Sequence, residues 1–393
     1  MPDLVDLFGG HFMSPVRDPY AAYARLRRED PVLLLDMPMG AGYLVTRYED
    51  VRTVLTDQVL FSSRANANGT GLVMGRTILE MDAKEHSRHR GIIAPAFVPK
   101  ALQGDLPRVV DSLVHELIDP LAAAGRADLV SQFAFQLPIR VIAHVIGIPI
   151  EEYATFHHWG LDIIGFVDDP PKGFEAAREM VEFLRPLLEQ RRAEPRDDLM
   201  SRLVHAEVDG ERLTDEEIFC FLRLLLPAGA ETTYRLIGTT LFALLTEPAH
   251  LAAVRDDRRL IDAAIEEALR WEAPVQYAIR EPTAATSLSN VDLASGAQVL
   301  VALGSANRDE EQFADPGSFV LERRPEDHMG FGFGRHFCVG AHLARLEART
   351  AIAAVLDRLS DLEIESDPDI GVVGLAFRSP NRLPVRFRSR STG

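Results

Sequence analysis

The decapeptide FGFGRHFCVG, residues 331–340, places Cys338 in a loop with three glycines, and the chain has only one other cysteine in 393 residues. The glycines are not spaced as in a dinucleotide-binding or P-loop motif, which argues against a phosphate site. A catalytic thiol would need a base, for which the loop offers His336. A zinc site would need three or four ligands, and the only others nearby are His336 and His342. The remaining alternative is that the loop is a plain turn with a purely structural role.

A further interpretation is a single thiolate that binds one metal ion axially, as haem iron is bound in some proteins. Glycines allow backbone amides to approach a sulfur atom closely, and the positive end of a helix stabilises a negative sulfur. The segment that follows, VGAHLARLEARTAIAAVLDRL (residues 339–359), has the pattern of a long amphipathic helix. The pattern therefore predicts that Cys338 lies where a helix begins.

The composition excludes several classes of function. A formal net charge of −17 argues against nucleic acid as the main partner, because binding phosphates needs a basic face. Cys220 and Cys338 form no CxxC pair, so we expect neither a disulfide scaffold nor covalently attached haem. This cysteine usage fits a reducing cytoplasm. The sequence shows no signal peptide and no apolar window of about 18 residues that would predict a membrane span.

Helical patterns dominate, with a smaller strand-rich part. The sequence predicts a helix over residues 18–30, a hairpin from residue 31 with its turn at residues 39–42, and a long loop over residues 62–80. Helical periodicity runs from about residue 86 to residue 270. Strand patterns fill residues 275–303, and a strand pair around a Ser-Pro-Asn turn is predicted near the C-terminus. No repeat or linker divides the chain, which we interpret as one domain over residues 1–393.

One predicted helix, from Thr214 to about residue 246, is apolar on most faces and carries disruptive residues at its centre. Thr214 and Glu217 form a capping-box start. Pro227 and the glycine and threonines after it predict a kink or a widened groove at residues 227–233. Glu231 in a buried helix must be paired, protonated or in contact with water. Two interpretations stay open: a kinked core helix, or a groove that binds a small ligand.

Five segments together resemble the cytochrome P450 superfamily of haem-thiolate monooxygenases. Phe331-x-x-Gly334-x-x-x-Cys338-x-Gly340 is similar to its haem-binding signature, and residues 228–233 (AGAETT) to its oxygen-activation motif. Glu267-x-x-Arg270 with Arg323 resembles its Glu-Arg-Arg cluster, and residues 82–90 its haem-propionate segment. The resemblance implies a mainly α fold with a minor β portion, the cytochrome P450 fold: a triangular helical bundle around haem with small β-sheets.

The resemblance also implies roles for individual residues. Haem b would be the cofactor, with Cys338 as its iron ligand and Thr232 and Glu231 as catalytic residues that deliver protons to bound dioxygen. The other residues expected to bind the cofactor are His86, Arg90, Arg280, Phe331, His336 and Gly340. The candidates for contact with substrate are nearly all apolar: Val73, Met74, Phe166, Leu225, Ala228, Val275, Ile279 and Phe377. They favour a hydrophobic substrate such as a terpenoid, steroid or alkyl aromatic, with a fatty acid left open by Arg64 and Arg76.

The resemblance implies that dioxygen and a ferredoxin with its NAD(P)H-dependent reductase are the partners. It implies an enzyme that hydroxylates its substrate and that is a cytoplasmic monomer. We expect it to bind neither a membrane nor nucleic acid. Residues 328–349 contain one acid, Glu347, against three arginines: Arg335, Arg345 and Arg349. This excess of positive charge predicts a local basic patch that would attract an acidic ferredoxin. Two alternatives remain. One is a peroxygenase that uses hydrogen peroxide, and the other is a haem-thiolate protein that binds a gas without turnover.

Overall fold

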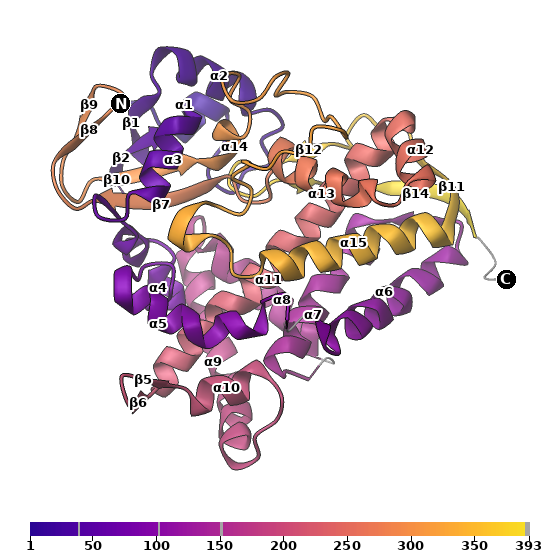
Figure 1. Cartoon of the computed structure of the whole chain (residues 1–393), viewed down its shortest axis with the longest axis horizontal. Coiled ribbons are helices and arrows are strands. Elements are labelled where there is room, and N and C mark those ends of the chain that lie inside the picture. The colour runs from indigo at the N-terminus through magenta and orange to yellow at the C-terminus, as the bar shows by residue number, and fades with distance from the viewer. Residues whose placement is uncertain (38–39, 101–102, 150–151, 390–393) are drawn as a thin grey trace.

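Helices make up most of the computed structural model, and the strands gather mainly at one side of it (Figure 1). The structure describes residues 1–37, 40–100, 103–149 and 152–389. The α-helices are α1 (Leu4–Phe8), α2 (Tyr20–Glu29), α3 (Tyr48–Thr56), α4 (Gly71–Met74), α5 (Ala83–Ile93), α6 (Leu106–Ala122), α7 (Gln136–Ile146), α8 (Tyr153–Ile164), α9 (Pro170–Ala193), α10 (Leu199–His205), α11 (Asp215–Thr246), α12 (Pro248–Asp256), α13 (Leu260–Trp271), α14 (Leu303–Ala306) and α15 (Ala341–Arg358). Shorter helical turns are η1 (Arg64–Asn68), η2 (Ala94–Ala96), η4 (Val130–Ala134), η6 (Gly165–Val167) and η7 (Gly334–His336).

The strands form small sheets. They are β1 (Val32–Met37), β2 (Gly40–Val45), β3 (Phe61–Ser62), β4 (Arg126–Asp128), β5 (Glu207–Val208), β6 (Glu211–Arg212), β7 (Tyr277–Pro282), β8 (Thr286–Leu288), β9 (Val291–Leu293), β10 (Gln298–Ala302), β11 (Leu359–Ile364), β12 (Val372–Val373), β13 (Ser379–Pro380) and β14 (Pro384–Ser389). The largest sheet has the order β1-β2-β10-β7-β3, in which β10 runs parallel to β2 and antiparallel to β7. This sheet therefore joins the N-terminal hairpin to strands more than 230 residues later in the chain.

Three local predictions differ from the structure. The hairpin is present, but its predicted turn is misplaced because Gly40 and Gly42 already pair with β1; the absence of a side chain at Gly42 makes room for Met37. The segment 62–80 is not a continuous loop, since it contains η1 and α4. The two C-terminal strands do not pair with each other: β13 pairs with β12, while β14 lies between β11 and β4. Such long-range pairing has no local signal in the sequence.

The predicted central helix is α11, and it crosses the helical part of the molecule (Figure 1). The Thr214 hydroxyl accepts a hydrogen bond from the Glu217 amide and the Glu217 carboxylate accepts one from the Thr214 amide, which confirms the capping box. The helix contacts α7, α8, α13 and α15. It stays helical through Pro227, which faces Gly160 of α8. Pro227 and Gly229 therefore allow close packing, against Gly160 of α8 and Ile142 of α7.

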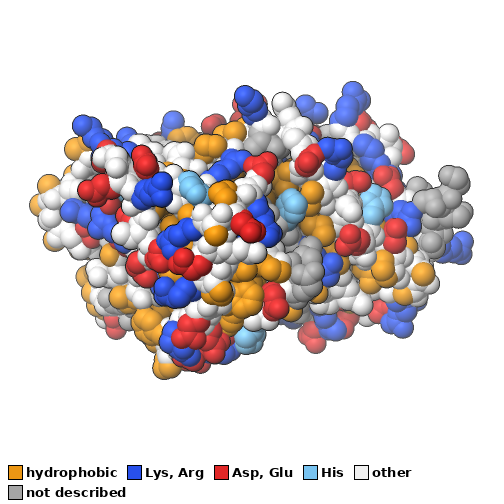
Figure 2. Space-filling view, turned by 90° about the horizontal axis from the view of Figure 1, so that it is seen from below, with side chains coloured by type: hydrophobic (Ala, Val, Ile, Leu, Met, Phe, Trp, Pro, Cys, Tyr) orange, Lys and Arg blue, Asp and Glu red, His pale blue; other side chains and the backbone are white. Residues whose placement is uncertain are grey.

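The outer surface mixes charges of both signs. Figure 2 shows Lys and Arg interleaved with Asp and Glu over one face, with hydrophobic side chains in patches among them. Within the described residues, no single helix is both long and apolar enough to span a membrane. The pair α11 and α12 passes that test by length and composition alone, with a bend of 107° between the two helices.

A buried ion cluster fixes the segment that leads to the cysteine loop. Glu267 and Arg270 of α13 are fully buried, and Arg270 donates to both carboxylate oxygens of Glu267 at 2.8 and 2.7 Å. Arg323 donates to Glu267 at 3.0 Å. Arg270 also donates to three backbone carbonyls in residues 307–318 at 2.8–3.1 Å. Because these hydrogen bonds satisfy the buried charges together, they hold α13 against the segment of chain that leads to residue 331.

We predict that Glu267→Gln lowers the free energy of unfolding by about 3–5 kcal/mol, because it leaves the buried guanidinium of Arg270 and the half-buried one of Arg323 without their carboxylate. A urea titration of the intact protein measures this change. The matched control is Glu182→Gln, which removes a carboxylate paired with Arg178 on the exposed face of α9 and should cost about 1 kcal/mol or less. Equal losses in the two variants would contradict a bracing role for the cluster.

Candidate functional site

Two adjoining cavities lie between α11 and the loop that carries Cys338. The first, which we call the thiol cavity, has a volume of about 280 Å³ and is lined by Cys338 and Thr232 among others. The second, the apolar cavity, has a volume of about 370 Å³ and is lined by Phe166 and Phe377 among others. Thr232, Val275 and Tyr277 belong to the walls of both. The two cavities therefore adjoin, and the thiol lies close to apolar walls.

The conformation of the cysteine loop depends on its glycines. The Cys338 amide donates to the Phe331 carbonyl at 2.9 Å and closes the loop. Gly332 and Gly334 both have φ of +71°, which is costly for other residues. A Cβ atom at Gly334 would also lie 2.6 Å from the Leu55 carbonyl of α3. The loop packs this closely only because these positions are glycine.

The Cys338 thiol opens into the thiol cavity. Burial away from bulk water raises the pKa of the thiol, while the Gly340 amide and the charges of Arg90 and Arg345 lower it. Helix α15 begins at Ala341, as predicted, so the sulfur lies beside a helix N-terminus. Within the described residues, no group of three His, Cys, Asp or Glu side chains is placed to hold a metal ion. This argues against the zinc interpretation.

Nitrogen donors gather at one end of the two cavities, where His86 and Arg90 of α5, Arg280 of β7 and His336 of the cysteine loop meet. The rings of His86 and His336 lie 4.2 Å apart. Within the part of the chain that the structure describes, neither ring nitrogen of the buried His86 has a hydrogen-bond partner. Arg280, which is 6% exposed, donates to the carbonyl of its neighbour Ile279. Burial and the nearby arginines lower the pKa of His86 to about 4 and that of His336 to about 2.

This cluster contains more positive charge than negative charge. Asp82 lies 4.0 Å from His336, but its carboxylate already accepts hydrogen bonds from Ser62 and Ser63. Buried cations and unpaired ring nitrogens are unfavourable without an anion to contact. A ligand with two carboxylates, a flat apolar body and one free axial position would fit the donors, the walls and the thiol at once. Haem has this chemistry, and the residues present fit it.

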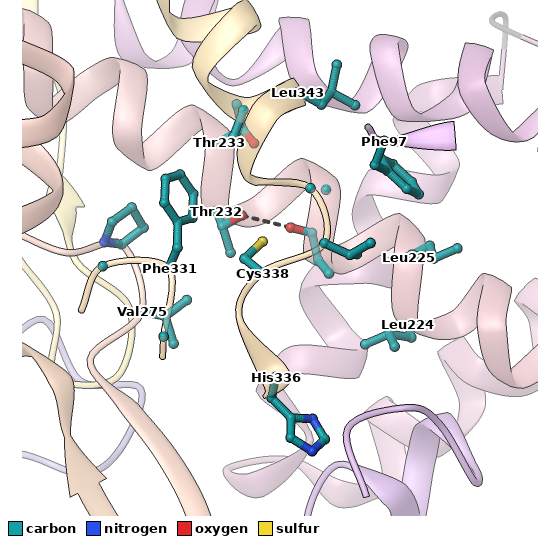
Figure 3. A pocket seen from close by; sticks show the side chains of 18 of the residues that line it. Phe97, Leu224, Leu225, Thr232, Thr233, Val275, Phe331, His336, Cys338 and Leu343 are labelled. Carbon is teal, nitrogen blue, oxygen red and sulfur yellow. Dashed lines mark hydrogen bonds between the residues drawn. The ribbon is translucent and has the colours of Figure 1, made fainter. Parts of the chain in front are cut away.

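Polar side chains of α11 point in two directions. The Thr232 hydroxyl lines both cavities and donates to the Ala228 carbonyl at 2.8 Å (Figure 3). Glu231 is 1% exposed and lines neither cavity; its Oε1 accepts from His157 Nε2 of α8 at 2.5 Å, and its Oε2 lies 3.7 Å from Arg235. Successive residues of a helix differ by about 100° in direction. Glu231 is therefore paired, one of the three states that the sequence allowed, and faces away from Thr232.

The structure brings most of the predicted site residues together. Cys338, Phe331, Gly340, His86 and Arg90 line the thiol cavity, Arg280 the apolar cavity, and His336 and Thr232 both. Of the eight substrate candidates, seven line a cavity: Met74, Phe166, Leu225, Ala228, Val275, Ile279 and Phe377. Val73 lines neither cavity and packs into the core.

Two groups of arginines differ from their predicted roles. Arg76 forms a bidentate pair with Glu85 and Arg64 lies 3.6 Å from Glu281, and neither lines a cavity. In the predicted basic patch, Arg345 pairs with Glu266 and Arg349 with Asp262, both from α13. Glu347, the one acid counted there, is buried. Only Arg335 keeps its charge without an acidic partner among the described residues; it bonds to Ala83, Ser87 and Gln58.

His157 and Tyr277 were not predicted from the sequence. His157 stands in an ordinary helical segment, and only its 2.5 Å contact with Glu231 indicates a role. Tyr277 has the spacing of any strand residue, yet its ring lines both cavities. Neither residue belongs to a motif, so only the packing of α8 and β7 against the site identifies them.

Comparisons with known proteins agree with this geometry. A family model described as "Cytochrome P450" matches residues 170–370. Cytochrome P450 monooxygenase PikC of Streptomyces venezuelae is 39% identical over 399 residues, covering 98% of this chain and 95% of that protein. Vitamin D(3) 25-hydroxylase of Pseudonocardia autotrophica is 35% identical, covering 98% and 97%. The structure of cytochrome P450 CYP109Q5 from Chondromyces apiculatus superposes with a TM-score of 0.86 at 36% identity, covering 96% and 97%.

Proposed function

Because this chain belongs to the cytochrome P450 family, whose members bind haem b and act as monooxygenases, we propose that it uses dioxygen to hydroxylate a small, mostly hydrophobic molecule. One observation carries the proposal: the thiol of Cys338 and the hydroxyl of Thr232 line the same cavity, which adjoins an apolar one. The haem, when bound, supplies the redox chemistry that activates dioxygen and oxidises the substrate. The protein holds it in place, excludes water and delivers protons.

The haem would be held from two directions. Cys338 would supply the sulfur that binds the iron, and the Gly340 amide would stabilise its negative charge. His86, Arg90, Arg280 and His336 supply donors for the two propionate groups, which would give the unpaired nitrogens of His86 their partners. Phe331, which lies under the Arg345 guanidinium at 4.5 Å, packs beside the thiol and limits access of water to it.

Protons would reach the cavity from the far side of α11. Thr232 is the group that touches the cavity, and Glu231 is the buried acid beside it in sequence. Glu231 and His157 share a short hydrogen bond, so this pair of side chains holds a proton between them. Because Glu231 faces α8 in this structure, a change in its side-chain rotamer is needed before it passes a proton toward Thr232. We infer that Thr232 donates the proton at the end of this route.

The cavity walls support a neutral substrate. Apart from Thr232 and Tyr277, the polar groups of the apolar cavity include Arg280 and His336, which the propionates would occupy. Three apolar residues line both cavities: Val275, Ala278 and Ala228. Arg64 and Arg76 are engaged with acids, which weakens the case for a fatty acid. A terpenoid, a steroid or an alkyl aromatic fits these walls best.

Electrons would come from a ferredoxin and its NAD(P)H-dependent reductase. Arg345 and Arg349 are paired with acids, but two other cations lie at the cysteine loop: Arg335 within it, and the exposed Arg52, which lies over Phe333 at 5.6 Å. These two positions support docking of an acidic protein close to Cys338.

The direct test of the proposed function is the identity of the iron ligand. We expect Cys338→Ser to lose the absorption that a thiolate gives the carbon monoxide complex of reduced haem, because Cys338 is the cysteine that lines the thiol cavity, whereas Cys220 is buried elsewhere. Cys220→Ser, which changes the other, buried cysteine, should keep that absorption. A Cys338→Ser protein with an unchanged spectrum would overturn the ligand assignment.

The propionate assignment predicts faster loss of haem from Arg280→Leu. Removing one charged hydrogen bond should cost about 1.5–3 kcal/mol, which corresponds to roughly 10- to 100-fold faster transfer of haem to a scavenging apoprotein. Arg64→Leu is the control, since Arg64 lies in a neighbouring segment and pairs with Glu281 instead. If both variants release haem at the wild-type rate, Arg280 does not hold a propionate.

The proton route predicts uncoupled turnover in Thr232→Ala. With electrons supplied by a ferredoxin system, product formation should fall roughly 100-fold while reduced oxygen leaves as peroxide. Thr240→Ala is a matched control, because the Thr240 hydroxyl makes the same bond to the carbonyl four residues earlier but lines neither cavity. Full coupling in Thr232→Ala would contradict the route, and a full rate with hydrogen peroxide alone would favour a peroxygenase.

A further inference from the structure

Aromatic side chains lead from the cavity wall toward the surface. Tyr277 of β7 lines both cavities, and its ring centroid lies 6.5 Å from that of Tyr23 in α2. The two hydroxyl groups share a short hydrogen bond in the interior. The Tyr23 ring lies 6.1 Å from that of Tyr20, one helical turn earlier. Three phenols thus follow one another at contact distance, starting where a substrate would lie.

The outer end of this series contains a base and an indole. The Tyr20 hydroxyl donates to the Glu272 carboxylate at 2.7 Å. The Arg308 guanidinium lies over the Tyr20 ring at 3.7 Å and over the Trp271 ring at 5.4 Å, and so fills the space between them. Trp271 is partly exposed to solvent. The series therefore ends at a side chain that an external reductant can approach.

The environment of the phenols determines how they can be oxidised. Tyr23 and Tyr277 are buried, and burial raises the pKa of all three phenols well above the ordinary value, so each is protonated at neutral pH. A phenol that loses an electron becomes strongly acidic and needs a nearby base. Glu272 is that base for Tyr20, and Arg308 and Arg378 hold it in place at 2.8 and 2.6 Å. Among the three phenols, Tyr20 is the one with a carboxylate partner among the described residues.

We propose that these four side chains, which we call the aromatic chain, carry oxidising equivalents out of the cavity when no substrate consumes them: Tyr277, Tyr23, Tyr20 and Trp271. The proposal rests on the proposed function, because it requires bound haem. The oxidant is a hydroperoxide that reacts at the haem in the empty cavity. Without an exit, the oxidising equivalent that remains would attack the haem or the cavity wall.

A hydroperoxide takes up two electrons and two protons as its O–O bond breaks to give ROH and water; the aromatic chain supplies the electrons one at a time, and solvent supplies the protons. One electron leaves Tyr20 and passes through the rings of Tyr23 and Tyr277 to the oxidant in the cavity, which is reduced by one electron. The phenolic proton of Tyr20 moves along the 2.7 Å hydrogen bond to Glu272, which leaves a neutral tyrosyl radical and a protonated carboxyl. Trp271 then returns one electron to Tyr20 across Arg308, and Glu272 returns the proton. A thiol or ascorbate in solution reduces Trp271 at the surface.

A purely structural role is the competing explanation, because the same residues join α2 to β7 and to the end of α13. The two explanations differ in what substitution does. A Tyr→Phe substitution keeps the ring packing at each position but removes the phenol hydroxyl, and a phenyl ring is much harder to oxidise than a phenol. Packing alone predicts no effect on the fate of an oxidant in the cavity.

The test uses the haem-loaded protein without substrate. Mixing with peracetic acid, rapid freezing and electron paramagnetic resonance should reveal a tyrosyl radical, which is lost in Tyr20→Phe. Tyr277→Phe should bleach its haem several-fold faster than the wild type under hydrogen peroxide, and Trp271→Phe should lengthen the life of the radical. Tyr48→Phe is the matched control: Tyr48 is buried and hydrogen-bonded but lies outside the aromatic chain, so its radical signal and bleaching rate should equal those of the wild type.

A tyrosyl signal that persists unchanged in Tyr20→Phe, or an unchanged bleaching rate in Tyr277→Phe, would overturn the proposal. If these variants fail to load haem, the wild type grown with ring-deuterated tyrosine decides: a spectrum that narrows supports a tyrosyl radical, and one that does not narrow overturns the proposal. Failure of the proposed function looks different, because a protein without a haem-thiolate spectrum fails before peroxide is added.

Discussion

The sulfur of Cys338 must remain open to a cavity inside a core that would otherwise close over it, and the surrounding structure holds it in that state. The loop closes on itself through the Cys338 amide and the Phe331 carbonyl, and it packs against α3 where Gly334 has no side chain. Behind it, Glu267 and Arg270 hold the approaching chain. Each brace is a backbone or buried polar contact, so the thiol is fixed without an apolar residue covering it.

Charges around the cavities are arranged so that the thiol meets no competing anion. Glu347 of α15 lines the thiol cavity, but it is buried, and burial raises its pKa well above the ordinary value, which disfavours a negative charge there. A second negative charge at that position would oppose formation of the thiolate. Glu231, the acid of α11, is turned toward His157 and Arg235. The positive charge is left at the end of the cavities where Arg90 and Arg280 meet the histidines.

The sequence was sufficient for the motifs and for the helices with strong local signals. The capping box at Thr214 places the start of α11 to the residue, and the segment after Cys338 is a helix as its periodicity predicts. Predictions failed where the outcome depends on residues far away in the chain. Arg345 looked free until α13 brought Glu266 against it, 79 positions earlier in sequence. Similarly, the pairing of β14 with β4 and β11 depends on strands that carry no local mark of their partner.

Glu231 and Tyr277 show why the roles of single side chains were the hardest to predict. A motif fixes the identity of Glu231, but the rotation of α11 against α8 decides that it faces His157 and not the cavity. No motif marks Tyr277, yet the register of β7 with β10 sets its ring at the cavity wall. Glu231 lies on the side of α11 that contacts α8, and Tyr277 lies on β7. The group suited to supply protons and the group suited to release electrons therefore come from different secondary-structure elements.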